Sequence, residues 1–389
     1  MNKFGKNFAL FLALGTSVSA VGCAGSVENG GQSSGADALN YDTAIISSLQ
    51  GKTIALLEGD IYEFAAGYEK GKSIEYADGN EKVNRYAPKP VMIVWENSRT
   101  GAEYYTLRLG LKNDLSDATD YITMDTCLLV EDLFAAKHYY YQIHAHYENE
   151  EMTTSQVFDF YTQALPRTIW VEGVSNTRDI GGYFTEDGKY QVKQGMVYRG
   201  GEVDASWGSI TDAGKEKLLY TYGIKTDLDL RGAALSASPI NDENTVLNYV
   251  NISAPYYYGI VQPEYKEALI TEIKTFADPD NYPIYLHCSL GRDRAGTLAF
   301  LINALLGVIE ADLYRDYEMS FFSVNGFADA AQGSGKIPVL LNNLDVLYDY
   351  LMGLGGDTLA ENTEAFMRGY LGITETEIVS IRNIMLEEI

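Results

Sequence analysis

The sequence predicts an all-β region followed by an α/β region. Between residues 91 and 161, short runs of aromatic and β-branched residues alternate with turn residues, a composition that favours antiparallel strands. Residues 282–307 show an apolar strand, a short loop with a glycine and a helix, which is typical of α/β folds. With 389 residues, the chain is long enough for two domains after a targeting segment. We expect four parts: a signal peptide at 1–22, a flexible tether at 23–48, an all-β domain at 49–164 and an α/β domain at 165–389.

The first 22 residues have the pattern of an export signal. Lys3 and Lys6 give a short basic start, and residues 8–20 carry no charge. This run is shorter than the about 20 residues that a transmembrane helix needs. It therefore predicts a cleaved signal peptide rather than a membrane span.

A cysteine follows the export signal. The sequence AVGC at 20–23 resembles the bacterial lipobox, in which small residues precede a cysteine that becomes lipidated. The leucine that usually opens a lipobox is Ala20 here, so ordinary cleavage nearby is the alternative. Residues 24–38 are rich in Gly and Ser and predict a flexible tether. We expect an exported lipoprotein at the bacterial cell surface, held to the membrane through Cys23, or a secreted protein.

Four segments carry the strand signal in the all-β region, at 91–95, 104–109, 138–147 and 157–161. Residues 49–86 leave two interpretations open, the first strands of this domain or a long insertion. His144 and His146 share one face of the third strand. Two histidines at this spacing can bind a metal ion, but no acidic or cysteine partners accompany them, so we expect solvated side chains.

The tyrosines of this region have a recognisable spacing. Leu133, Tyr139 and Tyr141 are placed as in a tyrosine corner, and Trp95 lies on an early strand. Together these residues resemble a fibronectin type III-like domain. The resemblance implies an all-β sandwich that contacts a protein or carbohydrate ligand.

The segment HCSLGRDR at 287–294 joins the predicted strand and helix of the α/β region. Such a loop directs backbone N–H groups and a helix N-terminus at one point, which binds a tetrahedral anion. Cys288 lies at its base, where the positive field favours the thiolate. Arg294 can donate two hydrogen bonds to phosphoryl oxygens. The pattern predicts phosphoryl transfer through a cysteinyl-phosphate intermediate, with a buried structural cysteine as the alternative.

The same segment resembles the signature of the cysteine-dependent tyrosine phosphatase superfamily, and more narrowly the HCxxGKDRTG loop of the bacterial atypical tyrosine and lipid phosphatases. Other motifs of that family follow in order: NTRDIGGY at 176–183, GMVYRGG at 195–201, GIKTDLDLR at 223–231, DYEMS at 316–320 and the closing helix at 370–382. The resemblance implies a central, mostly parallel sheet flanked by helices, with neither a metal ion nor another cofactor.

The resemblance also implies roles for individual residues. Cys288 is the nucleophile, Arg294 binds the phosphoryl group, and Asp293 is the general acid for the leaving group. A carboxyl beside a bound phosphate dianion should hold its proton more firmly, which suits that role; capping the next helix is the alternative. The other phosphate-binding residues are Ser289, Leu290, Gly291, Arg292 and Ala295. The supporting residues are His287, Arg178, Asp179, Asp229 and Arg231, with bracing the expected role of both aspartates.

Three positions depart from the family pattern. Arg292 replaces a lysine and keeps its charge, while Ala295 replaces a threonine or serine and loses a hydroxyl. Leu235 stands where the family has a glutamate. Ahead of the loop, three consecutive tyrosines at 256–258 leave two interpretations open, a wall of the substrate cleft or plain packing.

The charge composition of the chain limits which classes of molecule it is expected to bind. The net charge of −25 argues against binding to nucleic acid or to a membrane through basic residues. Salt screens this charge within about 8–10 Å, so Arg292, Arg294 and the loop amides should dominate at the site. Beyond Cys23 and Cys288 the only cysteine is Cys127, which we expect to be a core thiol without a disulfide.

The sequence therefore predicts a phosphatase that acts on phosphomonoesters, either in phosphorylated proteins (phosphotyrosine or phosphoserine) or in phosphoinositides. An extracellular inositol-polyphosphate phosphatase is one alternative, although it should need more cationic residues around the loop. A non-enzymatic protein that binds phosphate ligands or mediates adhesion is the other. The intact set of Cys288, Asp293 and Arg294 argues against the latter.

Overall fold

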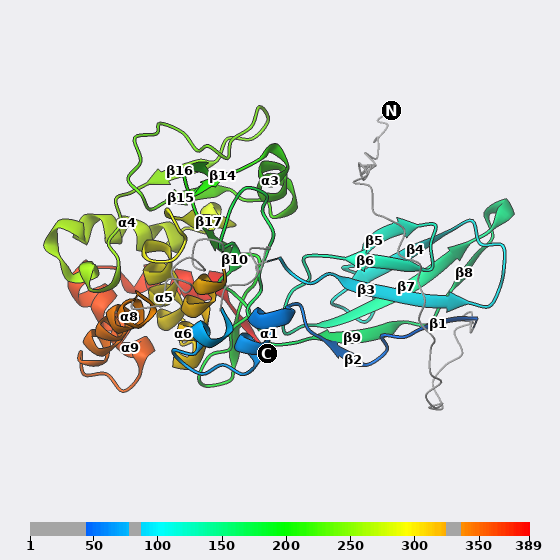
Figure 1. Cartoon of the computed structure of the whole chain (residues 1–389), viewed down its shortest axis with the longest axis horizontal. Coiled ribbons are helices and arrows are strands. Elements are labelled where there is room, and N and C mark those ends of the chain that lie inside the picture. The colour runs from blue at the N-terminus through cyan, green and yellow to red at the C-terminus, as the bar shows by residue number, and fades with distance from the viewer. Residues whose placement is uncertain (1–43, 78–86, 324–335) are drawn as a thin grey trace.

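The computed structural model describes residues 44–77, 87–323 and 336–389. In Figure 1 a β-rich body and an α/β body lie side by side along the longest axis. The predicted signal peptide, Cys23 and most of the predicted tether fall outside the described residues. No helix in the described ranges is long and apolar enough to cross a membrane.

The β-rich body consists of two facing sheets. One sheet has the order β1 (Ile45–Ser47), β3 (Val91–Asn97) and β6 (Cys127–Val130). The other has the order β2 (Lys52–Ile54), β9 (Phe158–Thr162), β7 (His138–His146), β4 (Tyr104–Gly110) and β5 (Thr119–Thr123), and β8 (Met152–Thr154) pairs with β7. A short 3-10 turn, η1 (Glu148–Glu150), lies between β7 and β8. One apolar cluster, with Trp95 and Tyr141 at its centre, includes residues from both sheets.

Strand β7 shows why this body folds as a sandwich. Its side chains alternate between buried and half-buried, so Tyr139, Tyr141 and Ile143 face the core while His144 and His146 face outward. The Tyr139 hydroxyl accepts a 2.7 Å hydrogen bond from the N–H of Phe134, which is the bond of a tyrosine corner. The strand pairings of β7 with β4 and β9 are antiparallel. The alternation predicted for the two histidines is therefore present.

The structure differs from the predicted organisation in two places. Strand β1 begins at Ile45, inside the expected tether. Within the expected all-β domain, α1 (Gly59–Ala66) and α2 (Ser73–Tyr76) pack instead on the α/β body. The buried Glu318 carboxylate accepts hydrogen bonds from segment 68–73, including one of 2.6 Å from the Ser73 hydroxyl. Such short helices gain their stability from packing, so their sequence pattern is weak.

The α/β body is built on a five-stranded sheet. Its order is β10 (Arg178–Asp179), β12 (Val197–Gly200), β17 (Ile284–His287), β15 (Thr226–Asp229) and β16 (Asn248–Asn251). The last four strands are parallel and β10 is antiparallel to β12. The register aligns Gly200, His287, Asp229 and Asn251. The loops that follow these strands therefore emerge at one edge of the sheet.

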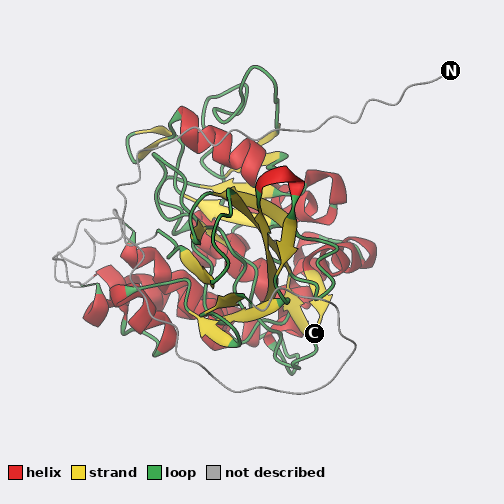
Figure 2. Cartoon of the chain, turned by 90° about the vertical axis from the view of Figure 1, so that its right-hand side faces the viewer, coloured by secondary structure: helices red, strands yellow, loops and turns green. Residues whose placement is uncertain are grey.

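Helices cover both faces of this sheet (Figure 2). One face packs on α4 (Lys266–Ala277), α5 (Arg294–Leu305), α6 (Glu310–Met319), α8 (Lys336–Met352), α9 (Leu359–Phe366) and α10 (Glu375–Met385). The other face packs on the π-helical turn η2 (Lys217–Thr221), which follows α3 (Asp212–Glu216) directly. Leu228, Ile284 and Leu286 point to the first face, and Tyr198 and Tyr285 point to the second. The predicted α/β class and the mostly parallel sheet are thus observed.

Shorter elements complete the α/β body. Two small antiparallel pairs are β11 (Tyr190–Val192) with β18 (Leu386–Glu388), from the end of the chain, and β13 (Asp204–Ala205) with β14 (Gly208–Ser209), which form a hairpin. Short helical turns are η3 (Tyr257–Val261), η4 (Pro263–Tyr265), η5 (Pro279–Asn281), η6 (Ser320–Phe322) and η7 (Met367–Leu371). Among them, η3 matters most for the site, because it follows β16 at the edge where the strands end.

Polar contacts join the two bodies at the turn between β6 and β7. The buried Arg167 guanidinium donates to the carbonyl oxygens of Asp132 and Leu133, at 2.8 and 3.1 Å. The side-chain amide of Gln194 exchanges two 2.8 Å hydrogen bonds with the backbone of Ala135. Lys137 reaches the carboxylate of Glu387 on β18. The β-rich body is therefore fixed against the α/β body.

Candidate active site

The loop at 288–294 is held by its carbonyl groups. Asn176 donates to the carbonyl oxygen of Leu290 at 2.8 Å, and Arg199 donates to that of Gly291 at 2.7 Å. The N–H of Glu202 donates to the carbonyl oxygen of Ser289 at 3.1 Å. Because successive carbonyls are bound by residues outside the loop, the N–H groups between them are turned the other way.

Those N–H groups are available to a ligand. Among the described residues, the N–H groups of Ser289, Leu290 and Gly291 meet no protein acceptor. Gly291 has φ +67°, and a Cβ on it would lie 2.5 Å from the backbone of Gly200. The loop therefore requires glycine there, both for the backbone conformation and for the close approach to β12. These amides belong to the loop in which the sequence predicts an anion-binding point.

Cys288 and Arg294 lie at the two ends of this loop. Cys288 follows β17 directly and is only 3% exposed. Arg294 begins α5, and within the described chain its guanidinium has no hydrogen-bond or ion-pair partner, although the ring of Tyr256 lies 6.0 Å from Cζ. A buried sulfur and a guanidinium without a hydrogen-bond or ion-pair partner among the described residues thus lie at the two ends of the loop that carries these amides.

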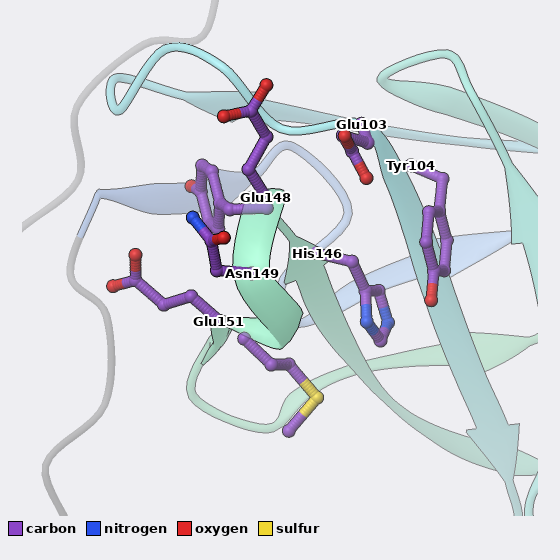
Figure 3. Close-up of a pocket in the computed structure, with 8 residues that line it drawn as sticks. Glu103, Tyr104, His146, Glu148, Asn149 and Glu151 are labelled. Atoms are coloured by element: carbon purple, nitrogen blue, oxygen red, sulfur yellow. The ribbon is translucent and has the colours of Figure 1, made fainter.

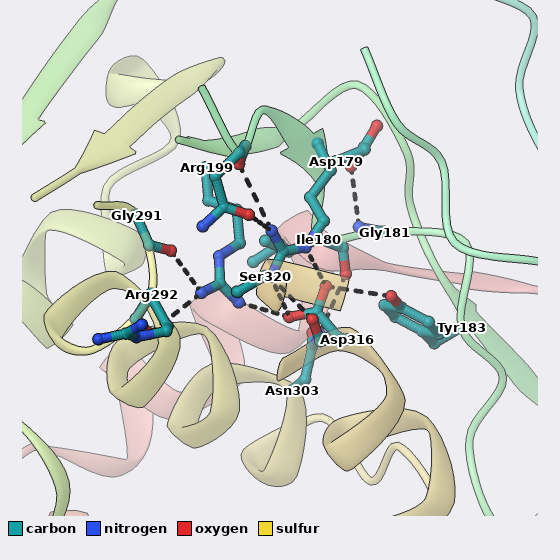
Figure 4. A network of polar contacts seen from close by, with 12 residues as sticks. Asp179, Ile180, Gly181, Tyr183, Arg199, Gly291, Arg292, Asn303, Asp316 and Ser320 are labelled. Atoms are coloured by element: carbon teal, nitrogen blue, oxygen red, sulfur yellow. Dashed lines mark hydrogen bonds and ion pairs between the residues drawn. The ribbon is translucent and has the colours of Figure 1, made fainter. Parts of the chain in front are cut away.

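Behind the loop, two buried arginines share one carboxylate (Figure 4). Arg178 Nε donates to Asp316 Oδ1 at 2.8 Å, and Arg199 Nη1 donates to Asp316 Oδ2 at 2.5 Å. Burial alone raises the pKa of the Asp316 carboxyl, but the two guanidinium groups outweigh burial and lower that pKa below its usual range. Since Arg199 also holds Gly291, this cluster, which we call the arginine clamp (Arg178, Arg199 and Asp316), links β10, β12 and α6 to the loop.

Asp179 lies beside the clamp but does not face the loop. Its carboxylate accepts from Arg167 Nη1 at 2.8 Å and from the N–H groups of Gly181 and Gly195 at 2.8 and 2.6 Å. Burial raises the pKa of Asp179, and Arg167 opposes that rise. This aspartate ties the chain around β10 to the junction between the two bodies.

Asp229 and Arg231 form a second brace. Arg231 donates two 2.8 Å hydrogen bonds to Asp229, and its Nη1 lies 2.7 Å from Asp204 and 3.3 Å from Glu202. Burial would raise the pKa of Asp229, but the hydrogen bonds from Arg231 lower it. Because Arg231 is committed to three carboxylates, it supports the segment beside Ser289 rather than offering a charge to a ligand.

His287 supports the loop from inside the sheet. Its ring is fully buried, and Nε2 lies 3.0 Å from Oδ1 of Asp227 on the neighbouring strand. Burial lowers the pKa of His287, but the adjacent Asp227 carboxylate more than compensates and raises it above the ordinary value. The pair fixes the end of β17 next to Cys288.

The hydrogen-bond partners of the Asp293 side chain are not those of a residue that caps the N-terminus of α5. Its carboxylate accepts from Arg292 Nε at 3.3 Å, from Arg292 Nη2 at 3.4 Å and from the Tyr257 hydroxyl. In the described part of the chain, it accepts no N–H from the first turn of α5. The capping role left open by the sequence is therefore absent. Arg292, expected to bind phosphate, directs its guanidinium at this carboxylate.

The three tyrosines ahead of the loop differ in burial. Tyr257 is buried, whereas Tyr256 and Tyr258 are 51% and 43% exposed. Tyr256 lies beside Arg294, and Tyr258 packs edge-on against Tyr350. Of the positions that depart from the family pattern, Ala295 is fully buried and Leu235 is 39% exposed. Cys127, expected in the core, is only half-buried at the start of β6.

The geometry agrees with a match to known proteins. A sequence profile described as the tyrosine phosphatase family matches residues 169–387, more than half of the chain. The chain belongs to this family.

Two curated relatives carry related names. A Cupriavidus necator protein named as a tyrosine-protein phosphatase is 26% identical over 170 residues, which cover 37% of this chain and 59% of that protein. A tyrosine-protein phosphatase of Nostoc commune is 26% identical over 147 residues, which cover 31% of this chain and 48% of that protein. The chain spans about half the length of these relatives.

Sequence reasoning left several functional positions of this tyrosine phosphatase family member unassigned. Asn176, Arg199 and Asp316 lie in the motifs that carry the family resemblance. Their place in these motifs could therefore have identified them from the sequence. Glu202 lies outside the motif letters that define the family pattern, and Tyr257 belongs to the tyrosine run at 256–258, which the sequence leaves open between a cleft wall and packing. Whether Glu202 and Tyr257 contribute to the site depends on which strands end next to the loop. The sequence alone does not specify that arrangement of strands.

The β-rich body also contains a cavity (Figure 3). It has a volume of about 570 Å³, and the rings of Tyr104 and His146 stack in it with centroids 4.1 Å apart. Its lining residues are Glu103, Tyr104, His146, Tyr147, Glu148, Asn149, Glu151 and Met152. With three carboxylates and neither lysine nor arginine in this lining, the cavity does not suit a phosphate ligand. Within the described residues, no cluster of three or more His, Cys, Asp or Glu could hold a metal ion.

Proposed function

We propose that this protein is a phosphatase that hydrolyses phosphomonoesters through a cysteinyl-phosphate intermediate. The observation that carries the proposal is the loop at 288–294. Within the described residues, buried Cys288 precedes amides without a protein acceptor, and Arg294 has no hydrogen-bond or ion-pair partner. The phosphoryl oxygens would accept hydrogen bonds from these amides and from the Arg294 guanidinium. Membership in the tyrosine phosphatase family supports the same chemistry.

The first step is attack of the Cys288 thiolate on phosphorus. An S–P bond forms while the P–O bond to the leaving group breaks, and Asp293 gives its proton to the leaving oxygen. The amides and Arg294 stabilise the charge on the three equatorial oxygens throughout. Asp293 suits this role because it lies in the loop, is half-buried and caps no helix N–H among the described residues.

The second step returns the enzyme to its starting state. A water molecule attacks phosphorus, the Asp293 carboxylate takes one of its protons, and the S–P bond breaks to release inorganic phosphate and the thiolate. In the wider superfamily, a hydroxyl after the loop arginine stabilises the leaving sulfur. Ala295 offers no such group here, and the hydroxyl of Thr297 donates to the carbonyl of Asp293 instead. We therefore infer that the second step is slow.

The substrate is proposed to be a phosphorylated protein, with phosphotyrosine or phosphoserine, or a phosphoinositide. An inositol-polyphosphate substrate has less support, because the charges around the loop are already committed. Arg231 contacts three carboxylates and Arg292 contacts Asp293. A ligand with many phosphates would find few free cations beyond Arg294 among the described residues. The intact loop also argues against a protein that only binds phosphate ligands.

The β-rich body is proposed to be a fibronectin type III-like domain that contacts a protein or carbohydrate partner. The two sheet orders and the tyrosine corner at Tyr139 support this assignment.

We further propose that Cys23 carries a lipid that anchors the protein at the cell surface. Mass spectrometry of the mature N-terminus tests the anchor, since cleavage anywhere except before Cys23 refutes it.

The enzymatic proposal is tested by comparing the native protein with Cys288→Ser, using Cys127→Ser as the matched control. Substrates are p-nitrophenyl phosphate, phosphotyrosine and phosphoserine peptides, phosphoinositides and phytate. We expect Cys288→Ser to abolish turnover but still bind tungstate, because amides and Arg294 make most of the site. Cys127→Ser and EDTA should leave turnover unchanged, and vanadate should inhibit. Turnover that survives Cys288→Ser, or that EDTA removes, would overturn the proposal.

A further inference from the structure

Tyr257 makes a contact that its position in the core does not explain. Its side chain is 5% exposed in η3, yet its hydroxyl donates to Oδ1 of Asp293 and also bonds the hydroxyl of Tyr317. Tyr317 comes from α6 and is 1% exposed. A phenol buried among apolar residues needs a partner, and here the partner is the carboxylate of the loop.

The backbone of Tyr257 is fixed to the same point. Its N–H donates to Oγ1 of Thr297 at 2.8 Å, and that hydroxyl donates to the carbonyl oxygen of Asp293 at 2.8 Å. Tyr257 has φ +51°, a left-handed conformation that is uncommon for a residue with a large side chain. The surrounding contacts hold this conformation, and such positions gather at functional sites. Both the main chain and the hydroxyl of Tyr257 are thus tied to Asp293.

The direction of the hydrogen bond follows from burial. Burial, and then the neighbouring Tyr317 and Asp293, raise the pKa of the Tyr257 phenol far above the physiological range. Burial and the nearby Asp293 carboxylate also raise the pKa of Tyr317. Both phenols keep their protons, so Tyr257 is a permanent donor to Oδ1. Arg292 is the charged group that faces the same carboxylate, at 3.3 and 3.4 Å.

We propose that Tyr257 is a positioning residue for proton transfer by Asp293. Its hydroxyl occupies Oδ1, so Oδ2, which also accepts a 3.4 Å hydrogen bond from Arg292 Nη2, carries the proton that passes to the leaving oxygen. Tyr317 holds the Tyr257 hydroxyl in turn, so that the carboxyl is aimed by a chain of two phenols rather than by the helix. The inference rests on the proposed phosphatase activity, and it adds a residue from outside the loop to that site.

The test is a double-mutant cycle between Tyr257→Phe and Asp293→Asn. Turnover is measured on p-nitrophenyl phosphate, whose leaving group needs little protonation, and on an alkyl phosphate, whose leaving group needs a proton. We expect Tyr257→Phe to lower kcat about tenfold on the alkyl phosphate and little on the aryl phosphate, with KM and tungstate binding unchanged. In the Asp293→Asn background, Tyr257→Phe should cause no further loss.

Tyr258→Phe is the matched control, since Tyr258 is a half-exposed neighbour whose ring contacts Tyr350. It should leave both substrates unaffected. An equal loss on both substrates, or a full loss that persists in the Asp293→Asn background, would reduce Tyr257 to a packing residue and overturn the inference. If the native protein shows no turnover that depends on Cys288, the proposed function fails first and this inference fails with it.

Discussion

The groups behind the loop at 288–294 and those in front of it differ in whether they have polar partners within the protein. Behind the loop, the arginine clamp pairs every buried charge, since Asp316 accepts from both Arg178 and Arg199. In front, within the described residues, the N–H groups at 289–291 have no protein acceptor, and the Arg294 guanidinium has no hydrogen-bond or ion-pair partner, although the Tyr256 ring lies 6.0 Å from it. The paired charges hold the shape of the loop, and the unpaired groups are left for a ligand.

This difference decides what a substitution does. A buried ion pair is expensive to break, because removing one partner leaves the other charge in an apolar interior. A front group contributes little to folding, because no protein contact depends on it. Substitutions behind the loop should therefore lower both stability and activity, whereas those in front should lower activity alone.

The largest expected effect is that of Asp316→Asn. It leaves two buried guanidinium groups without their shared carboxylate, so the free energy of unfolding should fall by about 3–5 kcal/mol. Turnover should fall too, because Arg199 no longer fixes Gly291. Urea denaturation measures the change. Glu375→Gln, which removes an exposed partner of Arg368, is the control and should shift stability by less than about 1 kcal/mol. Equal effects of the two variants would contradict the clamp.

Asp293→Asn tests the front of the loop. A general acid matters only when the leaving oxygen is basic, so turnover of alkyl phosphates should fall about 100-fold while aryl phosphates with good leaving groups change little. Because asparagine keeps an oxygen that can accept from the Tyr257 hydroxyl, stability in urea should stay close to that of the native protein. Steady-state rates on both substrate types provide the measurement. A similar loss on both would remove Asp293 from proton transfer.

Ala295→Ser should give a gain. A hydrogen bond from the new hydroxyl to the Cys288 sulfur would speed release of phosphate, with an increase in turnover of about tenfold. The native enzyme should show a burst of leaving group in stopped-flow assays, and the variant should show a smaller one. Ala299→Ser, at a buried alanine one turn further along α5, should change neither. A native enzyme without a burst, and with turnover unaltered by Ala295→Ser, would refute a slow second step.

The smallest effect concerns pH and His287. Its folded-state pKa is raised above the unfolded value, so its stabilising contribution is complete below about pH 6.5 and is lost as pH rises through the folded value. The free energy of unfolding should therefore decline from pH 6 toward alkaline pH, and Asp227→Asn should flatten this decline. Urea titrations at several pH values follow it. A native stability that increases over this window would show that His287 is not held charged.

The structural features that the sequence predicts are those determined by residues close together in the chain. The strand, loop and helix around Cys288 follow from residue order, and the outward face of β7 follows from alternation. The roles of Asp316 and Arg199 require β10, β12 and α6 to meet, although Arg178 and Asp316 are 138 residues apart. The side chain of Tyr257 points inward between two exposed tyrosines because its backbone is left-handed. A run of three tyrosines in the sequence does not predict that conformation.

The same limit explains the helices at 59–76. Glu318 binds the backbone N–H of Gly71 across 247 positions of sequence, so the partner that stabilises this segment is remote. A helix of eight residues carries too little periodicity to be separated from a strand or loop by pattern alone. Interactions between distant parts of the chain, rather than local preference, decide both this segment and the clamp.

The central claim is that Cys288 becomes phosphorylated during turnover. The most direct measurement is rapid acid quenching of the native enzyme with substrate labelled at the phosphoryl group, followed by mapping of the labelled peptide. The account predicts a label on Cys288 that appears with the burst of leaving group and decays as phosphate is released. A label on another residue, or an unlabelled protein while turnover proceeds, would contradict it.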